Sequence, residues 1–229
     1  MNGITTIGFD ADDTLWHNER HFQLTEQHFC DLLADYSSHD HLRERLLEAE
    51  KRNIGHYGFG AKGFTLSLIE TAIEVTGGKV SSQVISRILE AGRELLNYPV
   101  ETLPGVTEAL EALTGDYRLI VITKGDLIDQ ERKLAASGVD HFFDAVEIVS
   151  AKEKATYHRI FTHHGSGAPN AMMIGNSLKS DILPALEAGA WGVHIPYEVT
   201  WAMEHAEEPQ SHQRFRRLDR IDEVIKLLA

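Results

Sequence analysis

Three acidic residues stand within four positions near the start of the chain, at Asp10, Asp12 and Asp13. They follow the apolar segment Ile4–Phe9, whose pattern predicts a buried strand. Carboxylates this close repel one another when ionised, so they favour a divalent cation, or one of them keeps its proton and acts as an acid. Because side chains alternate along an extended chain, Asp10 and Asp12 should share one side and Asp13 should point away. The alternative is a solvated acidic turn that caps the next helix.

Two further polar groups follow predicted strands. Thr123 ends the apolar segment Arg118–Thr123, where its hydroxyl and the N–H groups of the next turn would suit an anionic oxygen. Lys152 comes just after the segment Ala145–Val149 and could neutralise carboxylate and phosphoryl charge. Lys154 is a competing candidate for this charge-neutralising role. Taken singly, a threonine at a strand end is usually a cap, and a lysine in a loop is usually solvated.

A fourth group of polar residues follows the predicted strand Ala171–Ile174. A glycine comes first, and then Asn176, Ser177 and, a turn later, Asp181. Amide and carboxylate oxygens of this kind are ligands that Mg²⁺ takes. The alternative is that Ser177 and Asp181 only cap the helix that follows.

The elements that must position these residues alternate between strand and helix. Helical patterns separate the strands after residue 117, which predicts a parallel sheet covered on both faces, a doubly wound Rossmann-like α/β core. Ligands bind such sheets at the carboxyl ends of the strands, where all the polar groups above are expected. The predicted strands are Ile4–Phe9, Arg118–Thr123, Ala145–Val149, Ala171–Ile174 and Gly192–Ile195.

A helical insertion is predicted between the first two strands. About a hundred residues separate them, far more than a crossover needs, and apolar residues recur there at helical spacing in four stretches. We therefore expect an α/β core formed by residues 1–15 and 100–229 and an α-helical insertion at 16–99. Within the insertion, Gly55–Gly63 holds four glycines and predicts a mobile link between the second and third helices. That link is a candidate substrate-facing loop or a simple surface connector.

The composition excludes several classes of protein. The 229 residues carry a formal net charge of −13, which argues against a nucleic-acid partner. No apolar run approaches the length of a membrane-spanning helix, so we expect no membrane insertion. Cys30 is the single cysteine, so no intrachain disulfide can form, and a cytoplasmic location is expected.

The four polar groups together resemble the motifs of the haloacid dehalogenase superfamily. The helical insertion after the first motif is similar to the cap of its phosphoglycolate-phosphatase-like branch. One departure stands out, because Asn176 occupies a position where the superfamily usually has an acid. The matching residues are Asp10, Asp12 and Thr14 for the first motif, Thr123 for the second, Lys152 for the third, and Gly175, Asn176, Ser177 and Asp181 for the fourth.

The resemblance implies a Mg²⁺-dependent phosphatase that acts on a small phosphorylated metabolite. Asp10 would attack phosphorus to form an aspartyl-phosphate, and Asp12 would serve as general acid and then as general base. The metal would be held by Asp10, the backbone carbonyl of Asp12, Asn176 and Asp181, while Thr123 and Lys152 would bind the remaining phosphoryl charge.

Three other functions stay open for this scaffold. Asn176 raises the possibility of a non-catalytic protein that binds a phosphorylated ligand. A phosphomutase would return the phosphoryl group to a sugar. A 2-haloacid dehalogenase is disfavoured, because its leaving group needs no acid at the position of Asp12.

Overall fold

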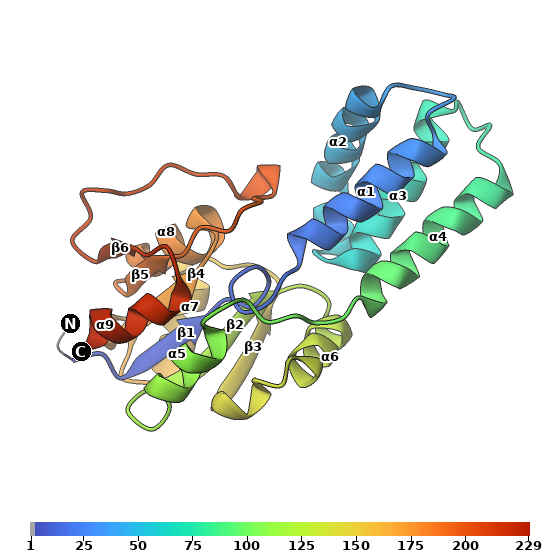
Figure 1. The fold of residues 1–229 in the computed structure, drawn as a ribbon. Coiled ribbons are helices and arrows are strands. Elements are labelled where there is room, and N and C mark those ends of the chain that lie inside the picture. Colours follow the sequence, from blue (N-terminus) through green and yellow to red (C-terminus); the bar gives the residue numbers. More distant parts are fainter. Residues whose placement is uncertain (1–2) are drawn as a thin grey trace. The chain divides into compact units, whose positions relative to one another are not determined.

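The structure is a computed structural model that describes residues 3–229, and its central feature is a six-stranded parallel sheet (Figure 1). The strand order is β3-β2-β1-β4-β5-β6, and neighbouring strands run parallel throughout. The strands are β1 Thr6–Phe9, β2 Arg118–Lys124, β3 Ala145–Val149, β4 Ala171–Gly175, β5 Trp191–His194 and β6 Phe215–Arg217. The chain steps one way from β1 to β3 and the other way from β4 to β6. This order confirms the predicted doubly wound α/β core.

Helices cover both faces of this sheet. They are α5 Val106–Leu113, α6 Leu127–Ser137, α7 Lys154–His164, α8 Leu183–Glu187 and α9 Val224–Leu228, with a π-helical turn at Leu178–Ile182 before α8. Successive residues of β2 alternate between the faces. Leu119 and Val121 join the buried cluster that contains α5 and α9, whereas Ile120 and Ile122 join the cluster that contains α7 and α8. Each of these side chains is almost fully buried, which stabilises the fold by roughly 1.5–3 kcal/mol per residue.

A second compact unit is helical. Its main helices are α1 Glu19–Leu32, α2 His39–Tyr57, α3 Ala61–Val75 and α4 Ser82–Asn97. Two of them begin at capping serines, since Ser38 accepts a hydrogen bond from the N–H of His41 and Ser81 accepts one from the N–H of Val84. The helices bury an apolar cluster of their own around Phe29, which includes Cys30.

The chain divides into two compact units, and the main boundaries lie at the two ends of the segment that contains α1 to α4. The sheet unit comprises the chain up to Glu19, Val100–Lys124 and Gln130–Ala229, and the helical unit comprises Arg20–Pro99 and Gly125–Asp129. Within residues 3–229, no helix is both long and apolar enough to cross a membrane.

The glycine-rich segment Gly55–Gly63 differs from its prediction, because most of it is helical. Helix α2 continues to Tyr57 and α3 begins at Ala61, so the link between them is only Gly58–Gly60. Gly63 sits inside α3 because the backbone packs closely there, and an added Cβ would lie 2.8 Å from the carbonyl oxygen of Gly58. A short strand, β6, was also not anticipated, since Phe215 is its one apolar residue.

Close helix packing at Gly92 gives a first testable expectation. An added Cβ at Gly92 of α4 would lie 2.7 Å from Cγ2 of Thr65 on α3, whose branched side chain has little freedom to move away. We expect Gly92→Ala to lower the free energy of unfolding by about 1–3 kcal/mol, although alanine favours helices. Gly55 of α2 has no atom within 4 Å of such a Cβ, so Gly55→Ala should stabilise the unit by up to about 1 kcal/mol.

Thermal unfolding followed by far-ultraviolet circular dichroism measures both changes. Shifts of the unfolding temperature in the same direction in Gly92→Ala and Gly55→Ala would contradict the packing argument.

Candidate active site

A tight turn after β1 positions the first candidate residues. The N–H of Asp10 donates to Ile174 on β4, and the carbonyl of Ala11 accepts from the N–H of Leu15. This reversal brings Thr14 back toward Asp10, and the Thr14 hydroxyl lies 3.4 Å from Oδ2 of Asp10. Asp10 is buried and stands at the carboxyl end of the central strand.

Asp13 is turned away from this group and holds the start of α1. Its carboxylate accepts hydrogen bonds from the N–H groups of Asn18 and Glu19. Its backbone has a φ of +62°, a left-handed conformation that a non-glycine residue adopts only where the surrounding contacts hold it. Burial raises the pKa of Asp13 to about 7, and the nearby charge of Asp12 adds to this effect.

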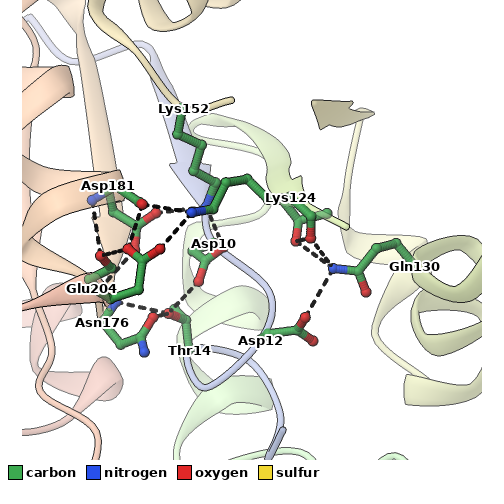
Figure 2. Close-up of polar contacts among 12 residues, drawn as sticks. Asp10, Asp12, Thr14, Lys124, Gln130, Lys152, Asn176, Asp181 and Glu204 are labelled. Carbon is green, nitrogen blue, oxygen red and sulfur yellow. Dashed lines mark hydrogen bonds and ion pairs between the residues drawn. The ribbon is translucent and has the colours of Figure 1, made fainter. Parts of the chain in front are cut away.

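Lys152 joins two buried carboxylates (Figure 2). Its ammonium group donates to Oδ1 of Asp10 and, at 2.6 Å, to Oδ1 of Asp181. Only 2% of the Lys152 side chain is exposed. Lys154, the competing candidate, is exposed at the start of α7.

The electrostatics of this triad follow from its burial. Burial raises the pKa of Asp10 to about 7, and the Asp181 carboxylate raises it further against the opposing effect of Lys152. Burial lowers the pKa of Lys152, but Asp10 and Asp181 together hold it above its ordinary value. One buried lysine thus faces two carboxylates. With both carboxylates ionised, the three groups carry a net negative charge, which a further cation would compensate.

The end of β4 supplies the next residues. An added Cβ at Gly175 would collide with the Asp181 side chain, so only glycine lets Asp181 fold back against the strand. Oδ2 of Asp181 accepts from the N–H of Ser177, and the Ser177 hydroxyl caps the π-helical turn by accepting from the N–H of Ser180. The structure therefore gives Ser177 the capping role that the sequence left open.

Asn176 is linked to the Asp10 group through Thr14. The Thr14 hydroxyl lies 3.3 Å from Oδ1 of Asn176 and accepts from its backbone N–H. The same hydroxyl therefore faces the side-chain oxygens of Asp10 and Asn176.

Asp12 and Thr123 form a second group, held by helix α6. The carboxylate of Asp12 accepts from the indole N–H of Trp16 at 2.8 Å, from Lys133 at 2.8 and 3.0 Å, and from the amide of Gln130 at 3.0 Å. The same Gln130 amide nitrogen lies 2.8 Å from the hydroxyl of Thr123. The sequence analysis did not single out Gln130 or Lys133 as functional. Their spacing of three residues, which puts both on one side of a helix, was the available signal.

Glu204 was also missed by the sequence analysis. It lies in the segment between β5 and β6, and its carboxylate accepts from Lys124 at 2.7 Å and from the hydroxyls of Ser177 and Ser180. Burial alone would raise the pKa of Glu204, but Lys124 and these hydrogen bonds hold it below its usual range. No local pattern in the sequence marks this residue, because its partners come from β2 and from the turn after β4.

The residues proposed for Mg²⁺ fit a hard divalent cation by their chemistry. Asp10, Asn176 and Asp181 offer carboxylate and amide oxygens at one edge of the sheet, which are the ligands that Mg²⁺ takes. Among residues 3–229, no group of three or more His, Cys, Asp or Glu side chains is clustered for a metal.

The fold and this site define a class of protein. It is a doubly wound α/β protein with acidic residues and a buried lysine at the carboxyl edge of its sheet. The chain belongs to the haloacid dehalogenase-like hydrolase family, which matches residues 4–189. Membership confirms the resemblance seen in the four motifs, and the protein is a hydrolase.

Similar proteins agree with this assignment. The glyceraldehyde 3-phosphate phosphatase of Methanothermobacter thermautotrophicus is 25% identical over 221 residues, which are 90% of this chain and 92% of that protein. The crystal structure of a haloacid dehalogenase-like family hydrolase from Xanthomonas campestris is 40% identical, covers 99% of this chain and 91% of its own, and has a TM-score of 0.88. The structure of a predicted phosphoglycolate phosphatase from Haemophilus somnus 129PT covers both chains fully at 20% identity, with a TM-score of 0.66, and shows the same fold.

Proposed function

We propose that this protein is a Mg²⁺-dependent phosphatase that hydrolyses a small phosphorylated metabolite through an aspartyl-phosphate on Asp10. The observation that carries the proposal is the second carboxyl group, Asp12, which N–H donors from Trp16, Gln130 and Lys133 hold in a fixed position two residues from Asp10. Attack on phosphorus displaces a basic alkoxide, which needs an acid, whereas displacement of a halide does not. The name of the Methanothermobacter relative supports the same class of substrate.

In the proposed reaction, the Asp10 carboxylate forms a bond to phosphorus and the bond from phosphorus to the ester oxygen breaks. Asp12 gives its proton to the departing alkoxide. It then takes a proton from a water molecule that attacks phosphorus, and the bond from phosphorus to Asp10 breaks to release phosphate. Mg²⁺ bound by Asp10, the backbone carbonyl of Asp12, Asn176 and Asp181 would supply charge compensation for the phosphoryl oxygens.

The remaining residues bind and orient the phosphoryl group. We assign Thr123 and Lys152 to this task, since Thr123 is 3% exposed at the end of β2 and Lys152 contacts Asp10 directly. Lys152 brings positive charge to the site of a chain whose net charge is −13, so local charge and not the global field favours an anionic substrate. In this proposal residues 1–15 and 100–229 form the catalytic core, and residues 16–99 form the cap domain.

The test is phosphate release from an aryl phosphate and from a panel of small phosphorylated metabolites that includes glyceraldehyde 3-phosphate, with Mg²⁺ and with EDTA. We expect phosphate release that requires Mg²⁺. Transfer of the phosphoryl group to a second hydroxyl would instead identify a phosphomutase, and stoichiometric binding without turnover would identify a binding protein. Halide release from a 2-haloacid without metal would overturn the proposal.

Asn176 offers a separate prediction for the metal. In Asn176→Asp a carboxylate replaces a neutral amide ligand, and ligand charge is a main determinant of affinity for divalent cations. The Mg²⁺ concentration for half-maximal activity should therefore fall by about tenfold. Asn97→Asp, at an exposed position on α4, adds the same charge outside the site and should leave this concentration unchanged. A titration of activity against Mg²⁺ measures both, and an unchanged or higher requirement in Asn176→Asp would remove residue 176 from the ligand set.

A further inference from the structure

We infer that Gln130 and Lys133 are positioning residues for Asp12, and this inference rests on the proposed function. Both belong to α6, three residues apart, and both donate to the Asp12 carboxylate (Figure 2 shows Gln130 and Asp12). They would fix the oxygen that carries the proton to the leaving group and takes it from water.

Lys133 contacts both carboxylate oxygens of Asp12. Its ammonium group lies 2.8 Å from Oδ1 and 3.0 Å from Oδ2 of Asp12, so it restrains rotation of the carboxylate. It also donates to Oδ1 of Asn18 at 3.0 Å, which fixes the ammonium group itself. The lysine side chain is 12% exposed and the aspartate side chain 23%, so water screens the pair less than it would screen a surface pair.

The orientation of the Gln130 amide is determined by its partners. Its nitrogen faces Oδ2 of Asp12 and the carbonyl oxygen of Lys124, at 3.0 and 2.7 Å, and a carbonyl oxygen can only accept a hydrogen bond. The amide nitrogen must therefore point at them, and it also donates to the Thr123 hydroxyl. One side chain thus joins the proposed acid–base residue to the proposed phosphoryl-binding residue.

This arrangement has a cost in stability that points to a functional reason. The amide oxygen of Gln130 is buried and has no hydrogen-bond partner, while the residue as a whole is only 3% exposed. A buried unsatisfied acceptor of this kind is unfavourable, and an apolar side chain of the same length would not create one. The presence of glutamine at this position is therefore explained by the contacts of its nitrogen with Asp12 and Thr123.

The role predicts a particular kinetic signature. If Asp12 is misplaced, proton donation fails, and this slows the departure of a basic alkoxide far more than that of an acidic phenol. In Gln130→Met and Lys133→Met we expect kcat/KM for an alkyl phosphate to fall by about 10- to 100-fold. We expect kcat/KM for 2,4-dinitrophenyl phosphate to change little, because this parameter reports the first phosphoryl transfer and its leaving group needs no acid.

The experiment compares the dependence of kcat/KM on leaving-group basicity in wild type, in both variants and in Asp12→Asn. A plot of log kcat/KM against the pKa of the leaving group should have a steeper slope in all three variants than in wild type. Adding Lys133→Met to Asp12→Asn should cause no further loss of kcat/KM. Glu131→Gln, at an exposed position of the same helix, is the matched control and should keep the wild-type slope.

The outcomes separate this inference from the proposed function. Equal losses for every substrate, or additive losses in the double variant, would show that Gln130 and Lys133 support the fold alone and would overturn the inference. Absence of phosphate release by wild type itself, at the level of an Asp10→Asn preparation, would overturn the proposed function and the inference with it.

Discussion

The Asp10→Asn variant is expected to lose phosphate-ester hydrolysis by on the order of 10⁴-fold or more, because the proposed nucleophile is removed. The amide keeps an oxygen that can accept from Lys152, and its NH₂ group can donate to the Thr14 hydroxyl, so the contacts of the site have replacements. Burial and the Asp181 carboxylate disfavour the charged form of Asp10, which raises its pKa to about 7. A neutral amide should therefore be tolerated.

The measurement is steady-state phosphate release together with thermal unfolding. Asp116→Asn, which makes the same chemical change at an exposed turn, should keep wild-type activity. Activity within tenfold of wild type in a folded Asp10→Asn protein would rule out Asp10 as the nucleophile.

The Lys152→Met variant is expected to lose about 3–5 kcal/mol of unfolding free energy, as well as most activity. The methionine has nearly the same length but no charge, so the carboxylates of Asp10 and Asp181 would face each other without the cation between them. Both carboxylates are at most 10% exposed, so water cannot replace the lost partner. Mg²⁺ should restore part of the stability in this variant, and more than it adds to wild type, because it would compensate the same two carboxylates.

Tryptophan fluorescence is the suitable probe for this change. All three tryptophans, at positions 16, 191 and 201, belong to the sheet unit that contains Lys152. Lys154→Met is the matched control, since that lysine is exposed two residues away and should change stability little. Equal stabilities of the Lys152 and Lys154 variants would mean that the buried triad does not carry the expected energy.

Hydrophobic pattern was sufficient to predict most of the core. The strand at Ala145–Val149 has the predicted bounds, because its apolar spacing and its flanking turns coincide. Strand β6 could not be predicted in this way. It has three residues and pairs through its backbone with β5 at the edge of the sheet, so side-chain pattern contributes almost nothing. The four glycines of Gly55–Gly63 suggested a mobile link, but tertiary context overrides intrinsic propensity over most of that segment, which is helical.

The site was predictable only where its residues follow strands directly. Parallel strands bring their carboxyl ends to one edge, so Asp10, Lys152 and Asp181 could be expected together, and the structure places them in contact. Gln130 and Glu204 could not be found by this reasoning. Gln130 reaches the site from inside a helix and Glu204 from the short 3-10 helix Ala202–Glu204, and their partners are distant in sequence.

The position of β1 in the sheet has a consequence for how the protein is made. This strand precedes the other five in the chain, yet its neighbours β2 and β4 begin only at Arg118 and Ala171. At about 5–20 residues per second, β1 waits roughly 5–20 s before the first residue of a partner is even synthesised. The continuous segment Arg20–Pro99 contains a buried cluster of its own and can form during that interval. The nascent chain therefore carries a folded helical unit behind an unpaired apolar strand, whose Ile7 and Phe9 remain open to chaperones and to aggregation until the rest of the sheet arrives.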